Sequence, residues 1–412
     1  MINRIVSPGG IEAWLVEDYA VPVIALDVAF KGGAAQDPIG KAGAAQLMAS
    51  LLDEGAGDLD DEAFQLRLEE SAVELSFSAS RDQISGSLRV LAAKRDEGAA
   101  LMALALSSPR FDEDAVERVR ESYLAGLRRE ANDPSSMASR ALFKALYPAH
   151  PYGESPRGTI ETMSALSVTD VKDRHEALLA RDNMRVTLVG AIDAHSAAAL
   201  LDQIFGGLPA KATLAPLTEA APASIGERKL IDLDVPQSVV QFATPGLKRD
   251  DKDFMAAMVV NHILGGGAFS SRLYQEVREK RGLAYSVSTQ LVPFNASALV
   301  AGGVATRNDR AAQSVALIED EIRAMATAGP TQEELDSAKK YLTGSYALRF
   351  DTSAKIANQL TQIQVEGFGI DYVDRRNGLI EAVGLKDAQR AASRMFGDGR
   401  TLVVAVGRPE GF

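Results

Sequence analysis

The chain has 412 residues, of which 46% are hydrophobic and 24% are charged, so a compact protein with two or more domains is expected. Its formal net charge of -12, without any long run of like charges, argues against a nucleic-acid partner, which would need a basic patch. The absence of cysteine excludes disulfides and thiolate-ligated metal sites.

The amino-terminal residues carry no recognisable targeting signal. MINRIVSPGGIEAWLVED lacks the apolar stretch of a signal peptide, and no apolar run of the chain reaches the roughly 18 residues that a membrane span needs. We therefore expect no membrane partner and a cytoplasmic protein, or a periplasmic one if a leader has been removed.

The first half of the chain alternates strand and helix patterns. Residues 11–17 and 23–30 are predicted as strands, whereas residues 41–54 carry apolar residues at helical spacing. Residues 72–92 again show strand patterning, and residues 112–131 form an apolar helical stripe. Strands that precede runs of helices favour an α+β architecture over a doubly wound parallel sheet.

Residues 209–228 are rich in Pro and Ala and lack apolar periodicity, which is typical of an interdomain linker. They separate an N-terminal domain, residues 1–208, from a C-terminal domain, residues 229–412, and landmarks recur in both at a nearly constant offset. The pairs are Pro22 with Pro236, the stripe Val116, Val119 and Tyr123 with Leu335, Ala338 and Leu342, and Asp170 and Gly190 with Asp387 and Gly407. The pattern predicts two duplicated αβ sandwich domains, each a mostly antiparallel sheet covered by helices.

The stretch at residues 40–56, GKAGAAQLMASLLDEGA, resembles a zinc-binding helix without its ligands. Similar segments occur in the pitrilysin and insulysin type metallopeptidases, the inverted zincins, which include the mitochondrial processing peptidases. Those enzymes carry H-x-x-E-H, in which two zinc ligands flank a general base, and a distal glutamate ligand. By this resemblance the two histidine positions hold Gln46 and Ser50. The base position holds Ala49, and the distal position falls at Gly126.

None of these four residues can do the required work, because Gln and Ser are poor zinc ligands and Ala and Gly offer no side-chain donor. The four histidines share no ligand spacing and are expected to be surface or locally hydrogen-bonded residues: His150, His175, His195 and His262. We therefore expect no metal in this chain and a core role for the helix.

The second half contains a segment, residues 261–289, that closely resembles the part of the same family that contributes an arginine and a tyrosine to the substrate. Family spacing assigns substrate binding to Arg278 and a hydrogen bond to the developing oxyanion of the scissile peptide to Tyr285. A phenolic hydroxyl is suited to the second role, and the donor fork of an arginine is suited to holding neighbouring carbonyls.

Local patterning supports this assignment. Gly282 can end a helix in the left-handed conformation, and LAYSVST can begin a strand with Tyr285, Val287 and Thr289 on one face. Arginine and tyrosine are then expected to converge across a tight turn. The glycines at 265–267 are expected to permit a close backbone approach.

The resemblance covers nearly the whole chain and implies half of a clamshell that encloses unstructured peptides. In two-subunit members of the family, one chain carries H-x-x-E-H and the other carries the Arg and Tyr residues, and this sequence is similar to the second kind. The resemblance thus implies a subunit of a heteromeric zinc metalloendopeptidase, a heterodimer or higher assembly. It would be inactive alone and would bind peptide beside a zinc site held by a homologous partner chain.

The alternative hypothesis is a catalytically silent scaffold or peptide-binding protein, since relatives of the processing peptidases play such a part in respiratory complexes. A pure scaffold has no chemical reason to keep the pair Arg278 and Tyr285. The pair therefore favours the subunit over the scaffold.

Overall fold

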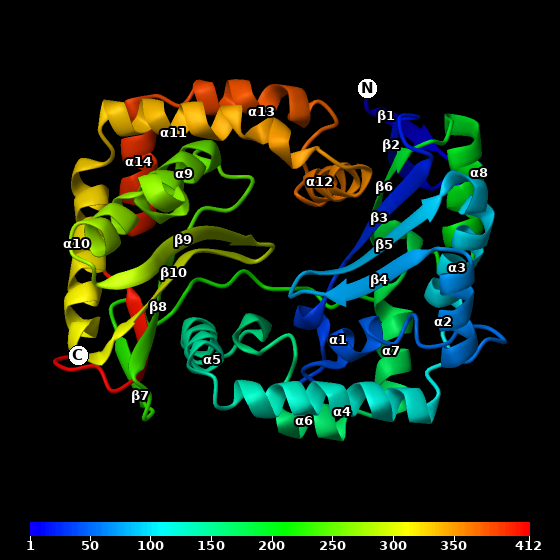
Figure 1. The fold of residues 1–412 in the computed structure, drawn as a ribbon, viewed down its shortest axis with the longest axis horizontal. Helices are drawn as coiled ribbons and strands as arrows, with labels where there is room; N and C mark the ends of the chain where they lie inside the picture. The colour runs from blue at the N-terminus through cyan, green and yellow to red at the C-terminus, as the bar shows by residue number, and fades with distance from the viewer. The chain divides into compact units, whose positions relative to one another are not determined.

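The computed structural model describes all 412 residues, which form two compact units that are not contiguous in sequence (Figure 1). Unit 1 comprises Met1–Leu127, Ser155–Pro216 and Ala347–Val373, and unit 2 comprises Arg128–Glu154, Leu217–Tyr346 and Asp374–Phe412. The contiguous division expected around residues 209–228 therefore differs from the observed units in two exchanged segments, Arg128–Glu154 and Ala347–Val373.

Unit 1 is built on a six-stranded sheet in the order β1-β2-β6-β3-β5-β4. The strands are β1 (Asn3–Val6), β2 (Glu12–Glu17), β3 (Val23–Lys31), β4 (Glu74–Ala79), β5 (Gln83–Leu91) and β6 (Met184–Gly190). Only β2 and β6 pair in parallel, and every other neighbouring pair is antiparallel. Strand β3 lies inside the sheet and is buried on both faces, as its run from Val23 to Phe30, apolar except for Asp27, requires.

Helices cover both faces of this sheet. They are α1 (Ala44–Ala49), α2 (Asp61–Glu70), α3 (Arg95–Ser107), α4 (Glu113–Glu130), α6 (Ile160–Ala165), α7 (Val168–Leu178), α8 (Ala194–Phe205) and α12 (Ser353–Val365). Figure 1 shows α3 and α8 on one face and α12 on the other. The core of the unit includes the apolar residues of α1, so the expected core role of residues 41–54 is confirmed.

Unit 2 repeats this plan with a five-stranded sheet in the order β7-β11-β8-β10-β9. Its strands are β7 (Arg228–Asp232), β8 (Gln237–Pro245), β9 (Ala284–Phe294), β10 (Ser297–Arg307) and β11 (Leu402–Gly407). Its helices are α5 (Pro134–Leu146), α9 (Phe254–Asn261), α10 (Ala311–Ala328), α11 (Gln332–Gly344), α13 (Tyr372–Glu381), which begins in unit 1, and α14 (Leu385–Phe396). The predicted α+β class is confirmed.

The two sheets share one topology. The single parallel pair of unit 2, β7 with β11, occupies the place of β2 with β6, and the remaining pairs are antiparallel in both units. The paired landmark residues also have the same structural roles in the two units. Gly190 and Gly407 end β6 and β11 with the same φ of 137°, and Asp170 and Asp387 each accept the backbone N–H of a helix N-cap residue. The shared topology supports the predicted duplication.

Each sheet also receives a helix from the other half of the sequence. Helix α5 packs on β8 and β11, and α12 packs on β3 and β6, the corresponding strands. The contacts of α12 are partly polar: Thr361 donates to Thr187 (3.0 Å), and the amide of Gln364 donates to the carbonyl oxygen of Val186 (3.0 Å). Beside them Asn358 donates to Asp27 (3.3 Å), whose other carboxylate oxygen is buried without a partner.

We expect Asp27 to make the stability of unit 1 pH-dependent. Burial raises the pKa of Asp27 to about 6 from an ordinary value of 3.8. The folded chain then holds this proton more tightly than the unfolded chain does. The stability that the proton contributes is therefore present in full below about pH 4, and it is lost as the pH rises through about 6.

The replacement Asp27→Asn should remove this loss, raising the melting temperature at pH 7.5 but not at pH 4. Thermal unfolding of the native chain and of Asp27→Asn is measured across this pH range. The difference between their melting temperatures removes the contribution of the other carboxyl groups that titrate in the same range. Asp58→Asn, at an exposed position, is the control and should change neither value. An equal shift at both pH values would contradict the assignment.

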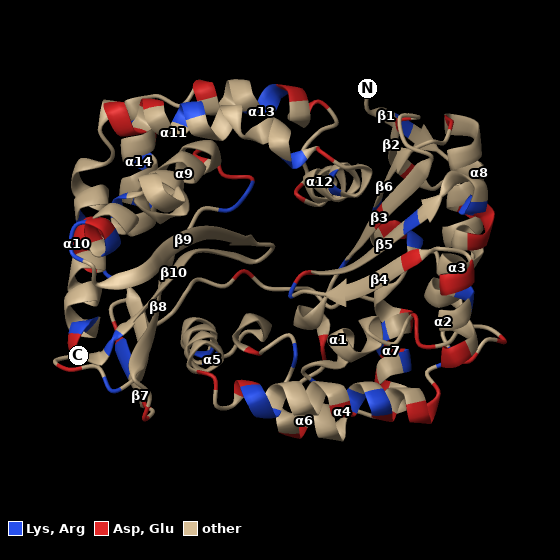
Figure 2. Cartoon of the chain, in the orientation of Figure 1, with Lys and Arg blue, Asp and Glu red and all other residues tan.

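Charged residues of both signs lie on the outer helices, as Figure 2 shows along α4. Acidic and basic side chains alternate there, so this helix presents no field of a single sign to a partner. None of the helices combines the length and the apolar composition that crossing a bilayer requires.

Candidate functional site

The segment that carries Arg278 forms a π-helical turn, Tyr274–Glu279, before it reaches β9. Gly282 ends this turn in the left-handed conformation with φ 58°, and its N–H donates to the carbonyl oxygen of Arg278 (2.8 Å). The predicted left-handed stop at Gly282 is confirmed, although the helix before it is π-helical rather than α-helical. Such turns recur at functional sites, because the extra residue redirects side chains.

Strand β9 contains a bulge at the tyrosine. In the ladder of β9 with β10, Val287 pairs with Val304 and Ala284 pairs with Thr306. Two residues of β9 therefore oppose one residue of β10, at Tyr285 and its successor. A bulge of this kind bends the strand and changes the direction in which a side chain points.

The bulge corrects one expectation about the strand face. Val287 and Thr289 are buried on one face, with 3% and 5% of their surface exposed, as strand alternation requires. Tyr285 was expected beside them, but 84% of its surface is exposed. The expectation was wrong because the extra residue breaks the period of two between Tyr285 and Val287.

Arg278 is held by aromatic rings. The centre of its guanidinium lies 4.7 Å from the ring centroid of Tyr274, 4.9 Å from that of Tyr285 and 6.0 Å from that of Phe269. The nearest carboxylate oxygen belongs to Glu279, at 3.8 Å. The expected convergence of Arg278 and Tyr285 is therefore present, and the rings fix the arginine while leaving its N–H donors for another acceptor.

The two other rings were not found from the sequence. Tyr274 is buried beneath the arginine, whereas Phe269 is 70% exposed and meets Tyr274 edge to face at 5.0 Å. Phe269 follows Ala268, a residue with a positive φ of 46°. Strain of this kind in a residue other than glycine often marks a functional loop. The only sequence signal for Phe269 was its position in GGGAFSS, where an aromatic residue stands among small and polar ones.

The glycine triplet brings a helix close to the same strand. A Cβ atom on Gly265 would lie 2.5 Å from Thr289 Oγ1 and 2.8 Å from the backbone nitrogen of Thr289. Because Thr289 belongs to β9, the π-helical segment His262–Gly266 can touch this strand only through a glycine. The expected close backbone approach is confirmed.

Two of the four positions that the resemblance aligned with a zinc site, Gln46 and Ser50, meet at Tyr123 in unit 1. The amide nitrogen of Gln46 donates to the hydroxyl oxygen of Tyr123 (3.0 Å), and the hydroxyl groups of Ser50 and Tyr123 are 2.6 Å apart. Ala49 is fully buried, and Gly126 is a buried residue of α4. Tyr123 thus fills the space between positions 46 and 50, a role that its place on the apolar stripe of α4 did not reveal.

A cavity of about 720 Å³ opens beside these residues, and its chemistry does not suit a metal. It is lined by Gln46, Ser50, Glu54, Arg118, Val119, Ser122, Tyr123 and Arg157. Glu54 is the single acid among them and is paired with Arg118 (2.9 Å). No group of three or more His, Asp or Glu residues in the chain could hold a metal ion, so the residues present do not fit zinc.

Three of the four histidines contact neighbouring groups of the fold. His150 lies 3.1 Å from the carbonyl oxygen of Thr218, and His175 lies 2.7 Å from that of Leu106. His195 is exposed on α8. His262 differs from the expectation, because it is buried and stacks on Tyr341 with ring centroids 5.0 Å apart.

Known proteins resemble this chain over most of its length. The sequence pattern described as "Peptidase M16 inactive domain" matches residues 165–342. A non-peptidase homolog, YmxG, of Helicobacter pylori is 28% identical over 372 residues, which cover 90% of this chain and 86% of that protein. The probable mitochondrial-processing peptidase subunit beta of Schizosaccharomyces pombe is 27% identical over 90% of this chain and 83% of its own length.

Among solved structures, a peptidase M16 inactive domain from Pseudomonas fluorescens has a TM-score of 0.93 at 29% identity, covering 99% of this chain and 98% of its own. The matched family pattern is described as an inactive domain, and the relative from Helicobacter pylori is described as a non-peptidase homolog. In sequence and in fold the chain is therefore similar to proteins of the peptidase M16 family, including ones described as inactive or non-peptidase.

Proposed function

We propose that this chain is the peptide-binding subunit of a two-chain M16 peptidase and is inactive without a partner that carries H-x-x-E-H. The observation that carries the proposal is the exposure of Tyr285 beside Arg278. A bulge turns the tyrosine away from the core, and its hydroxyl makes no hydrogen bond within the chain. Its ring lies against Arg278, whose guanidinium makes no hydrogen bond and only a long ion pair with Glu279 (3.8 Å). Packing alone gives no reason for this arrangement.

The two side chains suit peptide hydrolysis. When water attacks a peptide bond, negative charge develops on the carbonyl oxygen, and the hydroxyl of Tyr285 can donate a hydrogen bond to it. The planar fork of Arg278 can donate to the carbonyl oxygens of neighbouring residues, which fixes an extended peptide. Zinc and a general base would come from the partner, because positions 46, 49, 50 and 126 of this chain cannot supply them.

The relatives support this division of labour. The protein from Helicobacter pylori is named a non-peptidase homolog, and the protein from Schizosaccharomyces pombe is named a subunit of a processing peptidase. A chain without zinc ligands that keeps substrate-facing groups fits an assembly in which another subunit performs the metal chemistry.

The test is hydrolysis of a mixture of unstructured peptides, followed by mass spectrometry. Three samples are compared: this chain alone, an M16 chain with intact H-x-x-E-H from the same source alone, and both together. We expect activity only in the mixture, together with a complex of the two chains on size-exclusion chromatography.

Two results would overturn the proposal. Chelator-sensitive hydrolysis by this chain alone would show that it needs no partner. Activity of the H-x-x-E-H chain alone, unchanged when this chain is added, would leave this chain a scaffold or a peptide-binding protein.

A further inference from the structure

Strand β7 lies at one edge of the unit 2 sheet, and no further strand pairs with its free side (Figure 1). Among the helices and strands of the unit, only β11 makes extensive contact with it. The opposite edge of the sheet is β9, which carries Tyr285, and three strands lie between the two edges. A partner bound along β7 therefore leaves the β9 edge of the same sheet open.

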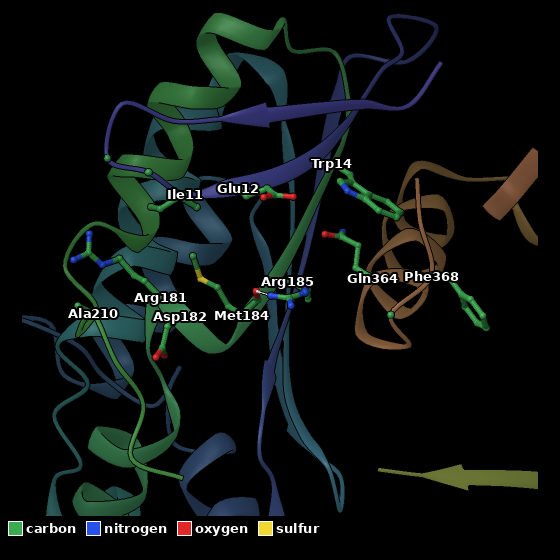
Figure 3. Close-up of a pocket in the computed structure, with 13 residues that line it drawn as sticks. Ile11, Glu12, Trp14, Arg181, Asp182, Met184, Arg185, Ala210, Gln364 and Phe368 are labelled. Atoms are coloured by element: carbon green, nitrogen blue, oxygen red, sulfur yellow. Dashed lines mark hydrogen bonds between the residues drawn. The ribbon is translucent and has the colours of Figure 1, made fainter. Parts of the chain in front are cut away.

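Unit 1 shows how the corresponding edge is covered. When the ladders β7–β11 and β2–β6 are aligned at the glycines that end them, Leu230 takes the place of Leu15. In unit 1, β1 pairs antiparallel with the free side of β2, and Leu15 is fully buried. Figure 3 shows this hairpin, with Glu12 and Trp14 on β2. Unit 2 has no counterpart of β1, and Leu230 is 53% exposed.

The free side of β7 carries a regular row of unpaired peptide groups. Val403 of β11 donates its N–H to the carbonyl oxygen of Glu227 (2.9 Å), which fixes the phase of the parallel ladder. Because peptide groups alternate between the two sides of a strand, the N–H and C=O groups of Arg228, Leu230 and Asp232 point away from β11. An edge of this kind is a template for pairing with another strand.

The three residues are complementary to a second copy of themselves. If two β7 strands meet antiparallel about a two-fold axis at Leu230, the two Leu230 residues face each other, and Arg228 faces Asp232 of the second copy. The outward peptide groups of all three residues then pair, and opposite charges stand across from each other on one face of the sheet. The contact is closed, because both copies use the same surface.

The charges on β7 select this register. The same peptide groups could also pair about an axis at Lys229 or at Ile231. The first would place two lysines directly opposite each other, which is unfavourable, and the second would place Leu230 opposite Asp232. Only the axis at Leu230 combines an apolar pair with two pairs of opposite charge.

The charged side chains can reach across the joint without any change of fold. Arg228 pairs with Glu319 (2.6 Å) and is 44% exposed, and Asp232 pairs with Arg408 (2.9 Å) and is 72% exposed. In the joint, Glu319 and Arg228 of one copy would be followed by Asp232 and Arg408 of the second. The signs of these four groups alternate, so the intrachain pairs and the new pair support each other.

We propose that two copies of this chain associate through antiparallel pairing of their β7 strands, which joins the two unit 2 sheets into one. Arg228, Leu230 and Asp232 of each copy form the joint. The β9 strands with Tyr285 lie at the two far edges of the joined sheet, so the proposal does not depend on the peptidase hypothesis.

The first test is sedimentation equilibrium of the full chain alone at micromolar concentrations and above. We expect a reversible dimer. Leu230→Pro should give a monomer, because proline removes the outward N–H of position 230 while the ladder with β11 stays intact. Leu230→Val keeps the N–H and an apolar side chain, so it is the matched control and should still form the dimer.

A charge exchange tests the register. Arg228→Glu and Asp232→Arg should each weaken self-association about tenfold or more, because each places like charges opposite each other twice in the dimer. A mixture of the two variants should associate again, since both contacts of the mixed dimer are then between opposite charges. Arg4→Glu, at an exposed position of β1, is the control and should leave self-association unchanged.

Thermal unfolding of each variant establishes that it is folded. A native chain that stays monomeric at the highest concentration would overturn the proposal. A dimer that persists undiminished in Leu230→Pro and in both charge variants would place the contact elsewhere and overturn it as well. Failure of the two charge variants to associate with each other would contradict the antiparallel register.

Discussion

In the two-chain peptidase that we propose, the replacement Tyr285→Phe is expected to lower kcat by about 100- to 1,000-fold, the usual cost of losing one donor to a developing oxyanion. The change removes only the hydroxyl group, which makes no hydrogen bond within the chain, and leaves the ring that stacks on Arg278. Because 84% of the side chain is exposed, the free energy of unfolding should change by no more than about 0.5 kcal/mol. Steady-state kinetics on one defined peptide measures kcat and KM separately.

The matched control is Tyr341→Phe. Tyr341 is also an exposed tyrosine of unit 2, 60% exposed, and its ring stacks on His262 rather than on Arg278. We expect its kcat to equal that of the native chain. An unchanged kcat in Tyr285→Phe would remove the tyrosine from the chemistry, whereas a raised KM alone would assign it to ground-state binding only.

Replacing Arg278 examines a different contact of the same aromatic cluster. Arg278→Lys keeps the charge but loses both the planar fork and the stack between Tyr274 and Tyr285. Full activity of the Arg278→Lys variant would show that position 278 needs only a positive charge.

Much of the fold follows from patterns that act over short distances. The buried strands, the α1 helix and the glycine stops each depend on residues within one or two turns, so periodicity was sufficient to find them. The repeated landmarks also pointed to one topology used twice, because Gly190 and Gly407 need the same unusual φ at the ends of corresponding strands. The local reasoning placed Arg278 near Tyr285 for the same reason: only a short turn separates them.

The features that escaped prediction depend on contacts between distant segments. The exchange of α5 and α12 between units is decided by which sheet each helix covers, and their amphipathic patterns fit either sheet. The bulge at Tyr285 is set by its pairing with β10, which no local pattern records. Tyr123 meets Ser50 across 73 residues of sequence, and a stripe on α4 does not tell which neighbour it meets.

The replacement Gly265→Ala is expected to lower activity of the mixture by about 100-fold, because a displacement of about 1 Å in a positioning element has that effect. The added Cβ would lie 2.8 Å from the backbone nitrogen of Thr289, and a backbone atom cannot move without moving β9. Strand β9 carries Tyr285 four residues earlier, so the displacement reaches the tyrosine to which we assign the oxyanion hydrogen bond. Overpacking of this kind should also lower the free energy of unfolding by about 1–3 kcal/mol.

Gly344→Ala separates this effect from the general cost of replacing a glycine. Nothing lies within 4 Å of a Cβ at Gly344, which ends α11, so the variant should keep native activity and unfold no more readily. Adding Thr289→Ala to Gly265→Ala removes the contact with Oγ1 but leaves the backbone contact, and only part of the activity should return. Full recovery would show that the side chain of Thr289, and not the approach of the helix to the strand, fixes the site. Native activity in Gly265→Ala itself would mean that Tyr285 acts without support from the helix beneath it.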